Sequence, residues 1–191
     1  MIRLEFLLEE PSMANVLKVI LPKILPPGYR LNENYFLRPH RGKSDLQKSI
    51  PNKIRTFSNF HEPVKIVILH DQDTNDCKKL KRQLMRLCEE SGNCPVLIRI
   101  ICRELESWFL GDMDAMESAY PGFKAHKYKN KAKFRNPDKC QAFEELTAIL
   151  PEFQKGSGSR SIAPHLNFQQ NASPSFQTFI SGLKKFVTNQ C

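Results

Sequence analysis

Residues 64–73 read VKIVILHDQD, and this stretch decides the expected fold. Its first seven residues form an almost continuous apolar run rich in Val and Ile, which is typical of a strand buried on both faces of a parallel sheet. Asp71 and Asp73 follow the run directly. Functional residues of α/β proteins gather at the carboxyl edge of the sheet, where the parallel strands end. The stretch therefore predicts an α/β fold with acidic side chains at that edge.

Three other segments are expected to join this strand in one sheet. Residues 2–8 (IRLEFLL), 30–37 and 96–102 (VLIRIIC) are short and mostly apolar, as strands of a covered sheet are. Because helical patterns separate the four segments, the strands should be mostly parallel. The expected fold class is α/β: a Rossmann-like, mostly parallel four-stranded sheet flanked by helices, with a helical C-terminal part.

Apolar residues at helical spacing predict a helix after each of the first three strands. The first helix is expected to follow Ser12, a plausible N-cap, and to end before Pro26. The second, at 43–58, is expected in two pieces because Pro51 removes a backbone donor. The third is expected over about 74–91.

We expect one domain over residues 1–191, with an α/β core at 1–110 that holds a metal site and a helical, basic part at 111–191. The last helix should begin with Ser173 as N-cap and Pro174 at its first position. The Gly/Ser-rich stretch 155–161 reads equally as a flexible loop or as a segment that presents cations to a substrate.

The chain is basic, and its charge is unevenly distributed. Its 191 residues hold 29 Lys and Arg against 20 Asp and Glu, a formal net charge of +9. The net charge is +5 over residues 1–60, −3 over 61–121 and +7 over 122–191. An enzyme that uses a metal to act on phosphodiesters needs carboxylates at the chemistry and cations around them. The pattern favours such an enzyme, although a solvated basic surface explains the total charge equally well.

Neither a membrane segment nor an export signal is indicated. The apolar stretches are far shorter than the 18 or so residues that a membrane-spanning helix needs. The six cysteines form no CxxC pair, so neither a zinc ribbon nor a disulfide framework is predicted. We expect a cytoplasmic protein with reduced thiols, no membrane contact and no cleaved targeting signal.

Acidic side chains follow three of the four predicted strands, so they should meet at one edge of the sheet. In chain order they are Glu9, Glu10, Asp71, Asp73, Glu104 and Glu106. Mg²⁺ and Mn²⁺ prefer oxygen ligands, and like charges packed closely repel unless a cation lies between them. The expected metal ligands are Glu9, Glu10, Asp71, Asp73 and Glu104. The alternative is that these acids only begin helices, where the helix dipole favours them.

Glu104 is preferred to Glu106 as a ligand. Residues two apart on a helix point in nearly opposite directions, so the two side chains should not bind one metal. Glu104 lies nearer to the end of the predicted strand.

Two other motifs fit this sequence poorly. An EF-hand loop that begins at Asp71 would need Gly and Glu where Asp76 and Arg82 stand. Gly42-Lys43-Ser44 resembles the end of a phosphate-binding P-loop, but the leading glycine of that motif would fall at Leu37. No ATP site is therefore predicted.

The segments LEFLLEEPS and IVILHDQD resemble the Toprim domain, the metal-binding fold of topoisomerases, primases and overcoming-lysogenization-defect nucleases. More closely, FLLEEPS, PHRGK, HDQDTNDC, RELESWFLGD and the tail SRSIAPHL…SPSFQTFISGL resemble a bacterial Toprim-like family, domain of unknown function 4276. By this resemblance Glu9 matches the Toprim glutamate, and Asp71 and Asp73 match the DxD pair. Glu10 replaces the usual glycine and Met13 replaces a second acid.

The resemblance implies a magnesium-dependent nuclease or another nucleic-acid-processing protein. Glu9, Asp71 and Asp73 would bind the metal, Glu9 could double as general base, and Lys155 could steady the developing charge. It also implies a separate ATPase partner of AAA or ABC type, in bacterial defence against phage. The competing hypothesis is a non-catalytic adaptor that keeps the fold and binds the ATPase or nucleic acid, and the departures at Glu10 and Met13 favour it. A phosphotransferase acting on small molecules is a third hypothesis.

The segment 122–139 is expected to bind nucleic acid, with DNA favoured over RNA. It holds seven basic residues and one acid, interleaved with Phe123, Tyr128 and Phe134. Cations mixed with rings are typical of surfaces that track a nucleic-acid backbone. The expected contacts are Lys127, Lys129, Lys131, Lys133, Arg135 and, on the Gly/Ser-rich stretch, Arg160. The alternative is a loop that docks an acidic protein.

Overall fold

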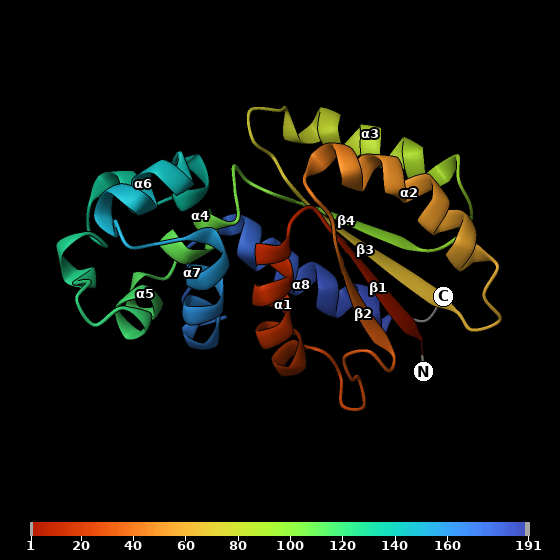
Figure 1. Ribbon diagram of the computed structural model, residues 1–191, viewed down its shortest axis with the longest axis horizontal. Helices are drawn as coiled ribbons and strands as arrows, with labels where there is room; N and C mark the ends of the chain where they lie inside the picture. Colours follow the sequence, from red (N-terminus) through yellow and green to blue (C-terminus); the bar gives the residue numbers. More distant parts are fainter. Residues whose placement is uncertain (1, 190–191) are drawn as a thin grey trace.

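The computed structural model describes residues 2–189, and within them four strands form one sheet. The strands are β1 (Arg3–Leu8), β2 (Tyr35–Pro39), β3 (Val64–Asp71) and β4 (Val96–Ile101). Their order is β2-β1-β3-β4, and every neighbouring pair is parallel (Figure 1). The predicted α/β class, with a parallel four-stranded sheet, flanking helices and a helical C-terminal part, is confirmed.

β3 lies between β1 and β4, and all eight of its residues are buried. Ile66 and Ile68 pack into a core on one face of the sheet, whereas Val67 and Leu69 pack into a core on the other face. Successive side chains of a strand point to opposite faces, so a strand with a core on each side needs apolar residues throughout. Five of the seven residues of VKIVILH are apolar, and the buried Lys65 ammonium is satisfied by donating to the carbonyls of Phe186 and Asn189.

Helices cover both faces of the sheet. α2 (Lys43–Ser58) and α3 (Cys77–Glu89) lie side by side over one face, and α1 (Pro11–Ile24) and α8 (Pro174–Thr188) lie over the other (Figure 1). α1, α2 and α3 are the crossovers between successive strands. Because each crossover returns the chain to the same end of the sheet, the loops after all four strands meet at its carboxyl edge.

Shorter helices after β4 form a helical part beside the sheet (Figure 1). They are α4 (Glu106–Leu110), α5 (Met113–Ala119), α6 (Ala142–Ile149) and α7 (Lys155–Ile162), with 3-10 turns η1 (Ala125–Lys127), η2 (Ala132–Phe134), η3 (Pro137–Lys139) and η4 (Ala163–His165). The buried ring of Trp108 joins this part to α8: its centroid lies 5.1 Å from that of Phe176 and 5.3 Å from that of Phe179. One continuous core therefore extends from the sheet into the helical part.

The helix ends agree with the sequence in part. Ser173 accepts a hydrogen bond from the Phe176 N–H and caps α8, as predicted. α1 instead begins at Pro11 with Glu10 as its N-cap, so the prediction that Ser12 caps it is wrong. α3 begins at Cys77 because Asp76 accepts a hydrogen bond from the Lys79 N–H (2.7 Å). That capping bond fixes the start of the helix three residues later than the apolar pattern suggested.

α2 and β2 also differ from the predictions. α2 is one helix that passes through Pro51, because Leu46, Ile50 and Ile54 bury a continuous face that outweighs the missing backbone hydrogen bond. β2 is Tyr35–Pro39 rather than 30–37. The residues before it form a turn in which Asn32 has a left-handed φ of 64°.

The Gly/Ser-rich stretch is a helix, α7, so the loop interpretation is wrong. Its small residues let it pack closely: Gly158 and Ser159 are buried, and Gly158 lies against the buried ring of Phe153. The Asn15 side chain on α1 donates to the Gly156 carbonyl (3.2 Å) and the Ser159 hydroxyl (3.1 Å). Close packing therefore stabilises a helix that its glycine content disfavours.

We expect Gly158→Ala to destabilise the protein by about 1–3 kcal/mol, because the added Cβ would lie 2.2 Å from Cε2 of Phe153. Gly156→Ala is the matched control on the same helix, since its Cβ would meet only Arg160 Nη1 at 4.0 Å. That change should stabilise α7 by about 0.5–1 kcal/mol. Urea denaturation measures both, and equal losses in the two variants would contradict the packing argument.

Candidate functional site

Glu9, which follows β1, organises the carboxyl edge of the sheet. β1 and β3 run in register up to the pair Leu8 and Leu69, and the Glu9 N–H donates to the Leu69 carbonyl (3.2 Å). The Glu9 side chain extends this pairing, because its Oε2 accepts a hydrogen bond from the Asp71 N–H (2.8 Å). Glu9 is buried, so its carboxylate is held in place at the end of β3.

His70 on β3 holds the same carboxylate from a second side. Its ring is fully buried, and its Nδ1 lies 2.8 Å from Glu9 Oε2 and 2.6 Å from the Asp71 carbonyl oxygen. The Gln47 amide on α2 lies 3.1 Å from Nε2, and we assign it as the donor, which leaves the ring proton on Nδ1. Burial by itself lowers the pKa of His70, but the hydrogen bond and charge of Glu9 raise it above its usual value. Sequence reasoning missed this residue because it lies inside an apolar strand.

Glu10, Asp71, Glu106 and Lys155 lie together at this edge, and we call them the acid cluster. Lys155 Nζ is 3.8 Å from Glu10 Oε2 and 3.9 Å from Glu106 Oε1. Glu106 is fully buried and Asp71 is 4% exposed. Among residues 2–189, neither Asp71 Oδ1 nor either carboxyl oxygen of Glu106 has a hydrogen-bond partner. Buried polar atoms without hydrogen-bond partners are costly, so these oxygens are candidates for contact with a ligand.

The acid cluster alters the proton affinity of its members. Burial raises the pKa of Asp71 well above its usual range, and the charges of Glu10, Glu9 and Glu106 raise it further. Burial also raises the pKa of Glu106 to about 7, against the opposing charge of Lys155. Burial lowers the pKa of Lys155, but the charges of Glu106, Glu10 and Asp71 outweigh that effect and raise it. The cluster therefore retains protons near neutral pH that isolated carboxyls would release.

Besides Glu9, two more of the predicted ligands lie outside the acid cluster. Asp73 has a left-handed φ of 51°, and its carboxylate pairs with Lys43 Nζ (3.2 Å) at the start of α2. Glu104 accepts a hydrogen bond from the Phe143 N–H (2.9 Å) near the start of α6. The structure thus brings Glu106, rather than Glu104, to Lys155. The spacing argument assumed that both residues are helical, whereas α4 begins only at Glu106.

A protein-family model described as Domain of unknown function (DUF4276) matches residues 8–184, which include Glu9 and the whole acid cluster. The chain belongs to the DUF4276 family. No curated protein and no solved structure matches it.

In this DUF4276 chain, the predicted nucleic-acid segment 122–139 is folded against the helical part. Phe123 and Phe134 are buried, and the Phe123 ring stacks on Tyr128 at a centroid distance of 5.4 Å. Three of its lysines have acidic partners: Lys124 with Glu117, Lys129 with Asp114, and Lys133 with Glu145. These contacts leave the prediction of nucleic-acid binding untested, but the two buried rings offer no face for base stacking.

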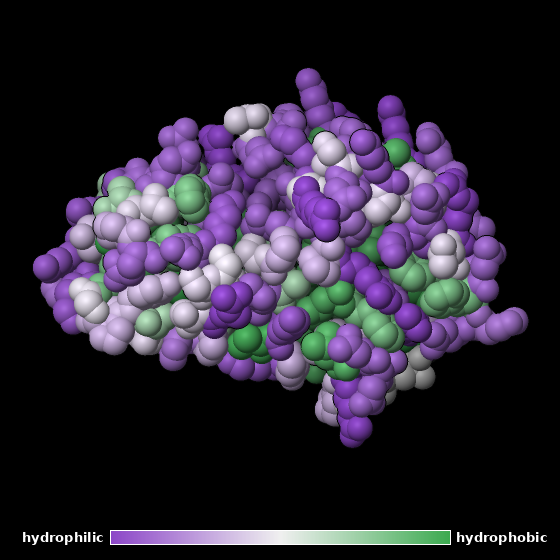
Figure 2. Space-filling model, viewed as in Figure 1, coloured by the Kyte–Doolittle hydropathy of each residue, from purple (hydrophilic) through white to green (hydrophobic). Residues whose placement is uncertain are grey.

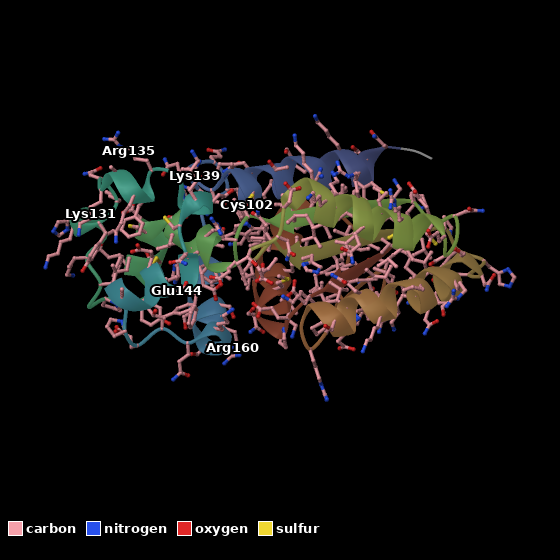
Figure 3. All side chains as sticks on the ribbon, turned by 90° about the horizontal axis from the view of Figure 1, so that it is seen from above. Cys102, Lys131, Arg135, Lys139, Glu144 and Arg160 are labelled. Carbon is pink, nitrogen blue, oxygen red and sulfur yellow. The ribbon has the colours of Figure 1, made fainter. Side chains whose placement is uncertain are left out.

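The remaining predicted contacts are exposed. Lys127, Lys131 and Arg135 have no ion pair among the described residues. Figure 3 shows Lys131 and Arg135 at the end of the molecule farthest from the sheet. Arg160 is exposed on α7, five residues and about 140° around the helix from Lys155.

The oxygen atoms of the acid cluster are suitable ligands for a hard divalent cation, but their present arrangement is not that of a metal site. Its unpartnered oxygens are the ligand type that Mg²⁺ and Mn²⁺ prefer. Within residues 2–189, however, no three His, Cys, Asp or Glu side chains are arranged to hold a metal ion as they stand. The Lys155 ammonium instead provides the positive charge between Glu10 and Glu106. A metal would therefore require these side chains to rearrange around it.

We expect Glu106→Gln to stabilise the metal-free protein at pH 8 and not at pH 4. The pKa of Glu106 rises from 4.5 to about 7 on folding, so its stabilising contribution is complete below pH 4.5 and is lost as the pH passes 7. The gain should be on the order of 2 kcal/mol at pH 8. Denaturation in EDTA at both pH values measures it, with Glu104→Gln as control. An equal gain in the control, or one independent of pH, would contradict the explanation.

Proposed function

We propose that this chain is a magnesium-dependent nuclease of Toprim type, which cleaves phosphodiester bonds of nucleic acid, DNA in preference to RNA. One observation carries the proposal: Asp71 and Glu106 are buried, with oxygens that lack a hydrogen-bond partner, at the carboxyl edge of a parallel sheet beside Glu9 and Glu10. Structures rarely keep such groups without a function, and active sites are where pKa values are most perturbed. A net charge of +9 suits a substrate rich in phosphates.

The carboxylates at this edge are the groups that would hold Mg²⁺ or Mn²⁺. Asp71 has a buried oxygen without a partner, and Glu9, Glu10 and Glu106 are its charged neighbours. Asp73, the second acid of the proposed DxD pair, could join them only by leaving Lys43. Once bound, the metal would polarise a phosphoryl oxygen and lower the pKa of a water molecule.

Other groups at the site have distinct roles in this proposal. Glu9 is the general base: its Oε2 is held by the Asp71 N–H and His70, so Oε1 is the atom that accepts a proton. Lys155 steadies the negative charge that develops on the phosphate. Its ammonium also lies 5.2 Å from the centroid of the Phe143 ring, which limits the directions open to it.

The biological setting is proposed on the Toprim resemblance. A separate ATPase of AAA or ABC type would act with this chain in defence against phage. A cytoplasmic location agrees with the free thiols of Cys77, Cys88, Cys94, Cys102 and Cys140. No helix in the described range 2–189 has both the length and the apolar character to cross a membrane.

A non-catalytic adaptor is the second candidate, and three observations favour it. The Glu9 carboxylate already accepts a hydrogen bond from the Asp71 N–H of β3. Lys155 neutralises part of the acid cluster. Among the described residues, no three His, Cys, Asp or Glu side chains are arranged to hold a metal ion. An adaptor would use the same edge to bind its partner and would not need a metal.

We expect Asp71→Asn to reduce Mg²⁺-dependent cleavage of duplex DNA by at least about 100-fold, because the metal supplies several kcal/mol of charge stabilisation. Calorimetry should give the wild type a Mg²⁺ dissociation constant of about 10⁻⁵–10⁻³ M and the variant no measurable binding. Asp114→Asn, at an exposed acid on α5, is the matched control and should retain both properties. Absence of Mg²⁺ binding by the wild type would contradict the nuclease proposal and support the adaptor proposal.

His70 is predicted to position Glu9, and two variants separate this role from simple packing. His70→Asn can place an amide donor near the position of Nδ1, whereas His70→Leu cannot. We expect the Leu variant to bind Mg²⁺ about 10–100-fold more weakly and the Asn variant to recover most of that loss. In cleavage assays kcat should fall while the KM for DNA stays constant. Equal defects in the two variants would show that the hydrogen bond to Glu9 is not the cause.

A further inference from the structure

The outer face of α2 and α3 is strongly basic. Within their bounds the two helices hold nine Lys and Arg residues against two acids. They pack side by side over the sheet, and Gln83 on α3 donates to Gln47 on α2 (3.4 Å). In Figure 2 the surface over these two helices, at the upper right, is mainly hydrophilic. Exposed cations on this α2–α3 face are Lys43, Lys48, Arg55, Lys78, Lys79, Lys81, Arg82 and Arg86.

Almost none of this charge is neutralised by the chain itself. Among the cations of α2 and α3, Lys43 alone makes an ion pair with a residue that the structure describes, at 3.2 Å from Asp73. Segment 122–139 differs, because Lys124, Lys129 and Lys133 all have acidic partners. Among the described residues, eight cations of α2 and α3 therefore have no ion pair, against four in segment 122–139.

The arrangement works against the stability of α3. Lys78, Arg82 and Arg86 follow one another at four-residue intervals, so like charges are neighbours along one stripe of the helix. Lys78 and Lys79 also lie in the first turn, where cations oppose the helix dipole, and the N-cap acid Asp76 offsets this effect only in part. A partner with closely spaced negative charges removes both penalties.

The α2–α3 face leads directly to the candidate site. α2 begins with Lys43, which reaches Asp73, and α3 begins at Cys77, only four residues after Asp73. Each helix therefore points its N-terminus at the carboxyl edge of the sheet. Next to this path is a hollow of about 400 Å³ on α3, whose charged lining consists of Lys79, Arg82, Arg86 and one acid, Glu90. An anion seated along the helices would extend to the acid cluster.

We propose that the α2–α3 face binds the phosphate backbone of duplex DNA and directs it to the acid cluster. This inference rests on the proposed function, since it supplies the substrate path of that site. Duplex is favoured over single strands because the one ring in these helices, Phe57, is buried and offers no surface for base stacking. α3 is about 20 Å long, enough to follow several phosphates of a duplex.

Matched charge variants test the proposal. The α3 triple variant is Lys79→Gln, Arg82→Gln and Arg86→Gln. The control is Lys18→Gln, Lys184→Gln and Lys185→Gln, at exposed residues of α1 and α8 on the other face of the sheet, and it removes the same charge. Binding of a labelled duplex of about 20 base pairs is measured by fluorescence anisotropy in EDTA, over about 50–200 mM KCl. The α3 triple should weaken binding at least about 10-fold and lower the slope of log K against log salt by about 2–3. The control should change affinity less than about twofold.

Several results would overturn the proposal. The first two are an equal or larger loss of affinity in the control and no duplex binding by the wild type. The third is that the wild type binds single-stranded DNA more tightly than duplex and the α3 triple does not change that affinity. The fourth is equal competition by polyglutamate of matched charge, which would indicate an acidic protein partner. Thermal melting checks the fold, and the α3 triple should melt no lower than the wild type because it loses like-charge repulsion. Because the binding assay contains EDTA, it needs no metal. Absence of Mg²⁺ binding or cleavage by the wild type would contradict the proposed nuclease and leave this binding result intact.

Discussion

The parallel pairing of β1 with β3 is the constraint on which the rest of the site depends. The two strands run in register from Arg3 and Val64 to Leu8 and Leu69, and the Glu9 carboxylate continues the contact by accepting the Asp71 N–H. A shift of one residue would turn every side chain of one strand to the opposite face. The apolar residues that bury both faces of β3 therefore fix the register, and the register fixes which acids meet.

The same edge holds charges that an ordinary core excludes. Asp71 and Glu106 are buried among other carboxyls, so their ionised forms are penalised by desolvation and by repulsion. Lys155 offsets part of this penalty, and it reaches the acids because Gly158 lets α7 pack against Phe153. The glycines of α7 thus lower its intrinsic helix stability but bring the Lys155 ammonium of the acid cluster into position. Local propensity and the needs of the site oppose each other here, and tertiary packing decides the outcome.

Most of the fold could be predicted because its signals are local. The apolar run of β3, the spacing of the helices and the Ser173 cap each depend on neighbours in sequence. The failures share a different cause. Pro51 stays inside α2 because of the core beneath it, and the Gly/Ser-rich stretch is helical because of Phe153 and Asn15. Neither cause is visible within a window of neighbouring residues.

The site was predictable in its location but not in its membership. Strand ends indicated Glu9, Glu10 and Asp71, whereas the choice between Glu104 and Glu106 depended on where α4 begins.

The distribution of free charge could not be predicted for the same reason. The number of lysines can be read from the sequence, but which of them form ion pairs depends on the fold. Lys129 is neutralised by Asp114 and Lys133 by Glu145, both far along the chain and on other helices. The neighbours of Lys78 on its own stripe are other cations. The electrostatic field near a polyanion depends on which cations lack an ion pair. Segment 122–139 is rich in lysine, but among the described residues α2 and α3 hold more cations without an ion pair.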